Sequence, residues 1–434
     1  MTRSQSSAGL PLSRRELLAR AAGLGLLGGL ERGGALSLHA LPSPRRDAAA
    51  DGVIQVFLGG GLSHLDSFDP KPDAAVEIRG AFRAIPTALD GVQFGELCPS
   101  LARVADKLAI VRSMSHTEAD HDRGTSNMLT GYRPSPAIRY PSLGSVVSHE
   151  LGMRANLPPY LVLPGLLASE LGSGYLSSAH GPFAVGGEPH RSDFRVPDLA
   201  PRSKLAEARG ARRRKLLDAV DAGFDPSADA VAATASFYEQ AWNLLGSPSA
   251  RDAFLIEKED AKLRESYGMT AFGQRLLLAR RLVDAGVRYV VVYSTGWDMH
   301  RGIGDQMRAR MPEVDRGMAA LVRDLDERGR LDRTLVTLTT EFGRTSRMNP
   351  DAGRDHWPRV FSVIAAGGGL RRGVVLGASD PTGSEPDGSV VRPADLAATV
   401  FTQLGIDSRK RLMSPGDRPI DIVRDGEVLT ELLA

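Results

Sequence analysis

The segment from Val287 to Gly368 alternates short apolar runs with an amphipathic stretch, and this alternation constrains the fold more than any other feature of the sequence. Tyr289–Tyr293 and Thr334–Thr340 are rich in β-branched residues, as buried strands are. Between them, apolar residues recur at helical spacing from Val314 to Leu325, and Gly329 follows where that helix would end. Strand, helix and strand in this order predict a right-handed βαβ unit in a parallel sheet.

Three further segments complete the expected architecture. Val53–Leu58 is an apolar run that stops at Gly59–Gly61, as a buried parallel strand and its exit turn do, and Val360–Ala365 is another strand-like run. The segment from about 201 to 285 is rich in Ala, Arg, Lys, Leu, Asp and Glu and predicts a helical insertion or cap. The sequence therefore predicts an α/β domain over residues 52–434, with a mostly parallel central sheet flanked by helices and this insertion.

Ionisable side chains concentrate in the segments that follow the expected strands. Ligands of an open α/β sheet bind beyond the carboxyl ends of its strands, so these groups are expected at one edge of the sheet. They are His64, Asp66, His121, Asp298, His300, Glu341, Arg344, Asp355 and His356. Imidazole with carboxylate suits Zn, Mn or Fe, whereas all-oxygen ligand sets suit Mg or Ca. The mixed set predicts a hydrolytic site with one or two metals, where a cation polarises a phosphoryl, sulfuryl or acyl oxygen and lowers the pKa of bound water.

Each of these side chains also has a purely structural interpretation. A single His or Asp in such a loop is commonly a turn residue, a helix cap or an ion-pair partner. Asp298 could cap the turn that follows it, and Arg344 with Asp355 could form a structural ion pair. The arrival of four separate segments at one sheet edge favours the functional interpretation of the set.

Composition excludes several other classes of function. The 434 residues carry 54 Lys and Arg against 52 Asp and Glu, a formal net charge of +2, so no basic nucleic-acid-binding face is indicated. Cys98 is the only cysteine, which excludes an internal disulfide and a Cys-cluster metal site. Ser63 lacks the Gly-x-Ser-x-Gly context of a serine hydrolase, and Gly59–Gly61 lacks the rest of a nucleotide-binding fingerprint.

The N-terminal segment has the features of an export signal. Arg14 and Arg15 precede the short, Gly-rich apolar stretch Ala21–Leu30, which is typical of a twin-arginine signal and too short to span a membrane. Residues 1–40 are therefore predicted to direct export in a folded state through the twin-arginine machinery, with residues 41–51 as a linker and no membrane span after signal removal. We expect a periplasmic or extracellular protein, and a disordered N-terminal arm is the alternative.

Six motifs occur in order along the chain, namely Gly59–Pro72, Glu77–Gly80, Met128–Gly131, Gly296–His300, Glu341–Thr345 and Gly353–Trp357. Together they resemble a large secreted bacterial family of unknown function, number fifteen-oh-one among such domains, from roughly Gly52 to the C-terminus. That family is grouped with the alkaline-phosphatase and sulfatase superfold, so the resemblance implies an alkaline-phosphatase-like fold. It also implies a divalent metal cofactor (Zn, Mn, Ca or Mg) and hydrolysis of phosphate or sulfate monoesters.

The resemblance implies a set of metal ligands. They are His64, Asp66, Asp298, His300, Glu341 and His356. Asp298 and His300 lie where the superfold places an Asp/His metal pair. Glu341 stands in place of a metal-binding Asp, and His64 or Asp66 would replace a ligand that the first strand lacks.

The resemblance also implies His121, Arg344 and Asp355 as catalytic residues. His121 occupies the position of the nucleophile, where no cysteine could mature into formylglycine. Arg344 would pair with the substrate, an anionic small-molecule or polysaccharide ester. A metal-bound water could instead attack directly, His121 could be a metal ligand, or the site could be non-catalytic. The sequence thus predicts an exported metal-dependent ester hydrolase, and the alternative is a catalytically silent metal- or ligand-binding protein of the same fold.

Overall fold

A central eight-stranded sheet organises the computed structural model, which describes residues 47–434 except 167, 197–211, 213–214, 217–236, 239, 241–243 and 245. The strands of the sheet are β1 Gly52–Gly59, β4 Leu108–Met114, β5 Tyr160–Leu163, β6 Phe183–Ala184, β7 Tyr289–Thr295, β8 Thr334–Thr339, β11 Phe361–Ala366 and β12 Val374–Leu376. Their order is β12–β4–β11–β8–β1–β7–β5–β6. The predicted signal over residues 1–40 and most of the predicted linker lie outside the described residues.

All strands of this sheet run parallel except β11. β1 lies between β7 and β8 and pairs in parallel with both. Helix α11, Ile303–Glu327, connects β7 to β8, so these elements form the strand–helix–strand unit predicted from the sequence. β11 pairs antiparallel with β8 on one side and with β4 on the other. The mostly parallel sheet flanked by helices confirms the predicted fold class.

The direction of β11 follows from how the chain leaves β8. Residues 340–360, all of them described, contain no helix that could cross back over the sheet. They form only the short strands β9, Gly343–Arg344, and β10, His356–Trp357, which pair antiparallel with each other. A parallel neighbour would need a crossover connection, whereas a direct return gives an antiparallel strand. The residues that follow β8 and those that precede β11 therefore lie at the same edge of the sheet.

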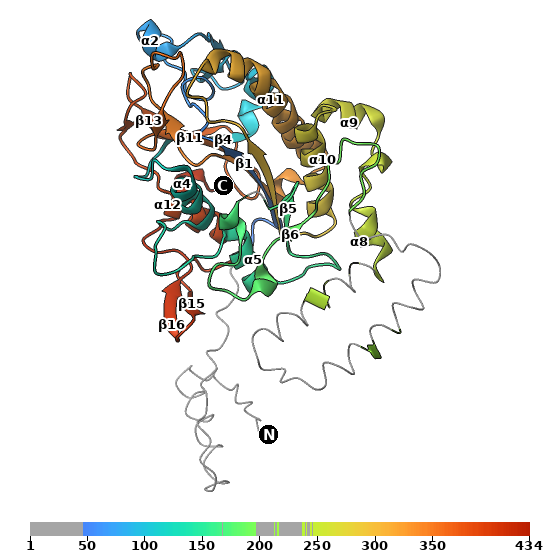
Figure 1. Ribbon diagram of the computed structural model, residues 1–434. Coiled ribbons are helices and arrows are strands. Elements are labelled where there is room, and N and C mark those ends of the chain that lie inside the picture. The colour runs from blue at the N-terminus through green and yellow to red at the C-terminus, as the bar shows by residue number, and fades with distance from the viewer. Residues whose placement is uncertain are drawn as a thin grey trace, which may run out of the picture. The chain divides into compact units, whose positions relative to one another are not determined.

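Helices cover both faces of the sheet (Figure 1). One face carries α3 Pro99–Arg103, α9 Ala261–Tyr267, α10 Ala271–Asp284 and α11, and the other carries α4 His121–Thr130, α5 Leu143–Leu151 and α12 Pro393–Gln403. Side chains of β1 alternate between the two faces, as strand geometry requires. Ile54 and Val56 belong to the core under α11, whereas Val53 and Phe57 belong to the core under α4 and α12.

Short elements complete the described part of the chain. They are α2 Val76–Arg79, α8 Pro248–Asp252, β2 Ala84–Pro86, β3 Gln93–Gly95, β13 Ala378–Ser379, β14 Pro386–Asp387, β15 Arg411–Ser414 and β16 Arg418–Asp421, with 3₁₀ turns at Ala105–Lys107, Ser169–Leu171, Ser178–His180, Ile256–Lys258, Leu331–Arg333 and Thr430–Leu432. The predicted helical insertion over about 201–285 lies partly outside the described residues, and α10 at its end packs against α11 and β7. None of the described helices is both long and apolar enough to cross a membrane.

Candidate functional site

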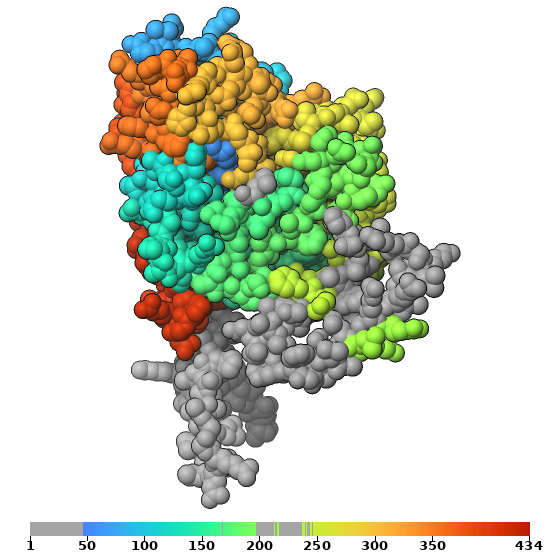
Figure 2. Space-filling model, in the orientation of Figure 1, coloured from blue at the N-terminus to red at the C-terminus, as the bar shows by residue number. Residues whose placement is uncertain are grey.

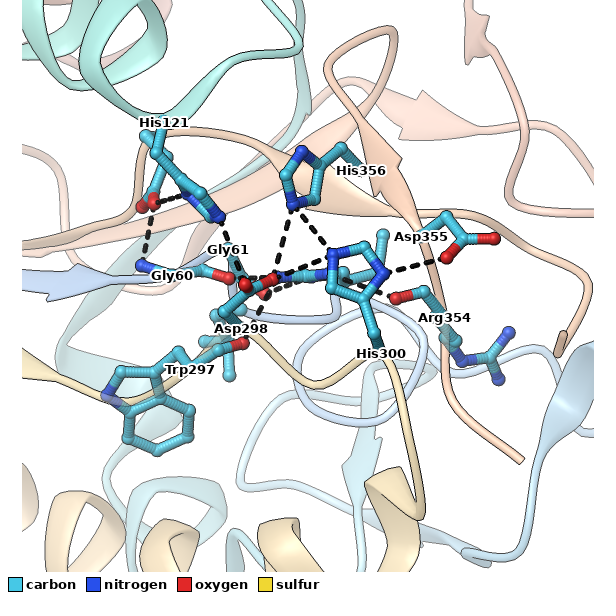
Figure 3. Close-up of polar contacts among 12 residues, drawn as sticks. Gly60, Gly61, His121, Trp297, Asp298, His300, Arg354, Asp355 and His356 are labelled. Atoms are coloured by element: carbon cyan, nitrogen blue, oxygen red, sulfur yellow. Dashed lines mark hydrogen bonds and ion pairs between the residues drawn. The ribbon is translucent and has the colours of Figure 1, made fainter. Parts of the chain in front are cut away.

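Loops from distant parts of the chain meet at the carboxyl edge of the parallel strands (Figure 3). His121 is the first residue of α4, and Asp298 and His300 lie in the loop after β7. His356 lies in β10, just before β11. In the space-filling view, the teal segment that includes α4 lies against the green segment that follows β5 (Figure 2). Both lie below the gold and orange segments in this view. The structure thus brings together four of the side chains singled out in the sequence.

Asp298 lies at the centre of this cluster. Its Oδ1 atom is 3.0 Å from Nε2 of His300 and 3.2 Å from Nε2 of His356. Its Oδ2 atom is 3.4 Å from Nε2 of His121. His121, Asp298 and His356 offer donor atoms that all lie within 4.8 Å of one another. Nε2 of His300 lies beside this group, 3.0 Å from Oδ1 of Asp298 and 3.0 Å from Nε2 of His356.

Hydrogen bonds behind two of the rings fix which nitrogen faces this space. Nδ1 of His356 donates to the carbonyl oxygen of Ala119 at 2.7 Å, and Nδ1 of His300 donates to Oδ1 of Asp355 at 2.7 Å. In a neutral ring the remaining nitrogen, Nε2, then carries a lone pair. The two Nε2 atoms lie only 3.0 Å apart, an approach that needs a shared proton or a cation between the lone pairs. Two nitrogens bound to one ion at about 2.1 Å would have a similar separation.

His121 is held in the same way by Glu341. Oε1 of the buried Glu341 side chain accepts Nδ1–H of His121 at 2.7 Å and the backbone N–H of Gly60 at 2.6 Å. Nε2 of His121 is shielded from solvent and has no hydrogen-bond partner among the residues that the structure describes. A carboxylate that orients a histidine ligand from behind is common at metal sites. These contacts place Glu341 behind the ring of a candidate ligand, whereas the sequence had suggested it as a ligand itself.

The charges around the cluster favour the metal-binding protonation states of Asp298 and His356, but not that of His121. Burial acts to raise the pKa of Asp298, but the hydrogen bond and charge of Arg344 outweigh burial and lower that pKa to about 2. Burial lowers the pKa of His356, so its ring is neutral near pH 7. The hydrogen bond to Glu341 raises the pKa of His121, so a proton competes with a cation for this ring more than for that of His356.

Arg344 lies beneath the cluster and is fully buried. Its Nη2 donates to Oδ1 of Asp298 at 2.6 Å, and its Nε donates to the carbonyl oxygen of Gly61 at 2.9 Å. Its Nη1 donates to the carbonyl oxygen of Arg354 at 3.0 Å. These hydrogen bonds use the Arg344 guanidinium within the protein, where it orients the carboxylate of Asp298. The sequence had instead suggested that Arg344 binds the substrate. The structural alternative raised from the sequence was an ion pair of Arg344 with Asp355, whereas the carboxylate that Arg344 pairs with is that of Asp298.

His64 and Asp66 have other partners than the cluster around Asp298. Nε2 of the buried His64 donates to the carbonyl oxygen of Gly383 at 2.9 Å. Oδ2 of Asp66 accepts from Nε of Arg354 at 2.8 Å, and both of these side chains are buried. Their predicted role as metal ligands gains no support from these contacts. Sequence reasoning missed Arg354, whose only signal is its place in the same motif as Asp355 and His356.

A cavity of about 360 Å³ opens beside the cluster. Its lining residues are Gly59, Gly60, His121, Asp122, Thr125, Ala168, Ser169, Glu170, Tyr293, Thr295, Asp298 and Glu341. These described lining residues include four carboxylates and no Lys or Arg. The cavity is therefore acidic, and a bound cation would be needed to make it attractive to an anion.

One family model matches almost the whole of the described chain. The model of a family described as "Protein of unknown function (DUF1501)" matches residues 50–433. Among curated proteins, no match to the sequence is found.

Solved structures that resemble the chain include three enzymes. A lipoteichoic acid synthase from Listeria monocytogenes is 10% identical over 87% of this chain and 76% of its own, with a TM-score of 0.36. A sulfatase from a Pseudoalteromonas species is 15% identical over 82% and 68%, with a TM-score of 0.34. An alkaline phosphatase from the Antarctic bacterium TAB5 is 13% identical over 76% and 94%, with a TM-score of 0.36.

Proposed function

The chain belongs to the DUF1501 family, and from the geometry of its site we propose that it is a metal-dependent hydrolase of phosphate or sulfate esters. The observation that carries this proposal is the convergence of three imidazole Nε2 atoms on the carboxylate of Asp298, with each Nδ1 already donated to a protein acceptor. Three imidazoles and one carboxylate suit Zn or Mn better than Mg or Ca, which prefer all-oxygen sets. We assign His121, Asp298, His300 and His356 as the ligands.

The side chains around the ligands supply the rest of the chemistry. A divalent ion bound there provides a Lewis acid that polarises an ester oxygen. Glu341 and Asp355 fix the rings of His121 and His300, so the ligands are oriented before an ion arrives. The hydroxyl groups of Thr125 and other lining residues can donate hydrogen bonds to the oxygens of an ester in the cavity. Substrates would be anionic small-molecule or polysaccharide esters.

Turnover of chromogenic esters tests this proposal. The purified protein is assayed against aryl phosphates and aryl sulfates, with Zn, Mn, Ca or Mg added to protein first stripped with a chelator. We expect hydrolysis of one ester class that depends on the added ion, with Zn or Mn the most effective. Equal activity in stripped and reloaded protein would contradict a metal-dependent mechanism.

The second candidate is a catalytically silent metal-binding protein. It is favoured by the position where the family resemblance places a nucleophile, because that position is occupied by the imidazole of His121, the first residue of α4, and not by a hydroxyl side chain. It predicts a stoichiometric ion without turnover of any aryl ester. The ester assay therefore separates the two candidates, whereas metal analysis alone does not.

Asp355 is predicted to act on the metal through His300. Asp355→Ala removes the carboxylate that accepts Nδ1–H of His300, and loss of such a partner typically costs about 10- to 100-fold in metal affinity. The measurement is a competition titration of Zn against a chromophoric chelator. Asp351→Ala is the matched control, because Asp351 lies in the same loop and its side chain makes, among the described residues, only an exposed ion pair with Arg301. An unchanged affinity in Asp355→Ala would remove Asp355 from the site.

We infer that the protein is exported, because Arg14 and Arg15 precede a short Gly-rich apolar stretch. These residues lie outside the described part of the structure. Replacing both arginines by lysine keeps the charge and removes the paired guanidinium groups. The full-length variant is expected to accumulate inside the cell, as measured by fractionation and immunoblotting. Export at the level of the unaltered protein would refute twin-arginine routing.

A further inference from the structure

We propose that the centre holds a single divalent ion, because the guanidinium of Arg344 permanently supplies the second positive charge beside Asp298. This inference rests on the metal centre proposed above and adds the number of ions to it. It also assigns Arg344 as a positioning residue that orients a ligand and sets the charge of the site.

The guanidinium of Arg344 occupies the space in which a second cation would lie on this side of Asp298. Its Nη2 contacts Oδ1 of Asp298 and the carbonyl oxygen of Gly60, and Nε contacts the carbonyl oxygen of Gly61. These are the oxygens that a second ion next to Asp298 would need as ligands on this side. Because the side chain is fully buried and its Nη1 is bonded to the carbonyl of Arg354, the guanidinium cannot swing out to make room.

The loop after β1 is shaped to admit this guanidinium. Gly61 has a φ of +82°, and a Cβ atom there would lie 3.0 Å from Nε of Arg344 and 2.9 Å from the ring of Phe342. A residue with a side chain would therefore collide with both neighbours, in a backbone conformation that favours glycine. Glycine at this position thus lets the loop pass close to the guanidinium.

The charge balance of the cluster also favours one ion. Asp298, Glu341 and Asp355 contribute three negative charges and Arg344 one positive charge, while the ligand histidines are neutral when they bind a metal. One divalent ion cancels the resulting formal charge of −2. A second divalent ion would leave an excess of two positive charges in a partly buried cluster, which is unfavourable.

A second ion would have one alternative position, on the side of Asp298 that faces the cavity. Oδ2 of Asp298 is turned toward His121, and Asp122 and Glu170 line the same cavity. Asp122 is exposed and Glu170 is half-buried, so water screens their charges. Two ions in the centre would require these carboxylates as ligands.

The number and spacing of bound ions can be measured without any substrate. The full-length protein is stripped, loaded with excess Mn(II), desalted and examined by metal analysis and by electron paramagnetic resonance. We expect one Mn per chain in excess of the amount retained by Asp298→Asn, which serves as the baseline for ions bound elsewhere. The spectrum should be that of an isolated Mn(II) ion, without the multiline pattern of a coupled pair.

The outcomes separate this inference from the proposed function on which it rests. Two Mn per chain with a coupled spectrum would overturn the single-ion inference and leave the metal centre standing. In that case the double variant Asp122→Asn, Glu170→Gln would be expected to lose the second ion. Binding no greater than that of Asp298→Asn would refute the metal centre itself, and the single-ion inference with it.

Discussion

Replacing Asp298 by asparagine is expected to abolish metal binding and ester hydrolysis together. Asp298 is the one carboxylate that contacts all three candidate histidine ligands, and its ionised form is favoured by a pKa of about 2. Loss of a group behind a ligand costs about 10- to 100-fold in metal affinity, so loss of the charged ligand itself should cost more than about 100-fold. The measurements are Zn affinity by chelator competition and turnover of the best aryl ester at saturating Zn.

Asparagine is chosen over alanine for a structural reason. Its amide oxygen can still accept from the buried Arg344, whereas alanine would leave that guanidinium unpaired and would destabilise the fold. Asp305→Asn is the control, because Asp305 is an exposed residue of α11 whose one ion pair within the described part of the chain is with Arg308. Full metal affinity in Asp298→Asn, with a thermal unfolding midpoint equal to that of the control, would contradict the assigned centre.

The second large effect is expected on stability. Asp66 and Arg354 form a fully buried ion pair at 2.8 Å, and breaking such a pair by removing one partner costs about 3–5 kcal/mol. Asp66→Ala leaves the charge of Arg354 uncompensated, so the free energy of unfolding should fall by about this amount in a urea titration. The metal affinity should also fall, because Arg354 anchors the loop that carries Asp355 and His356.

Two further variants make this prediction specific. Asp73→Ala removes an exposed carboxylate from the same part of the chain and should change the free energy of unfolding by less than about 0.5 kcal/mol. The double variant Asp66→Leu, Arg354→Met removes both charges and should be more stable than Asp66→Ala alone. If Asp66→Ala lost no more stability than Asp73→Ala, the motif after β1 would have no anchoring role.

The parts of the fold that the sequence predicted are those determined by local pattern. Tyr289–Tyr293 and Thr334–Thr340 correspond to β7 and β8, and the helical spacing between them corresponds to α11. The rule that ligands gather beyond the carboxyl ends of strands then brought His121, Asp298 and His356 into one candidate set. Periodicity and strand ends are local properties, so they can be read without knowing which strands are neighbours.

The parts that the sequence did not predict depend on long-range partners. The partner of Asp66 is Arg354, 288 residues further along the chain, and no local pattern distinguishes an anchoring carboxylate from a metal ligand. The burial of Arg344 depends likewise on Gly60 and Gly61, which follow β1 and are far from Arg344 in the sequence. The antiparallel direction of β11 depends on the path of residues 340–360, and apolar periodicity carries no information about direction.

X-ray absorption of the zinc-loaded protein tests the central claim most directly, because it reports the ligands of the bound ion without requiring a substrate. We predict a first shell of nitrogen and oxygen at about 2.0–2.1 Å, with the outer-shell scattering of the imidazole rings of His121, His300 and His356. That scattering should weaken in His356→Ala. A first shell of oxygen atoms alone, identical in the parent protein and in His356→Ala, would contradict a metal centre built from these loops.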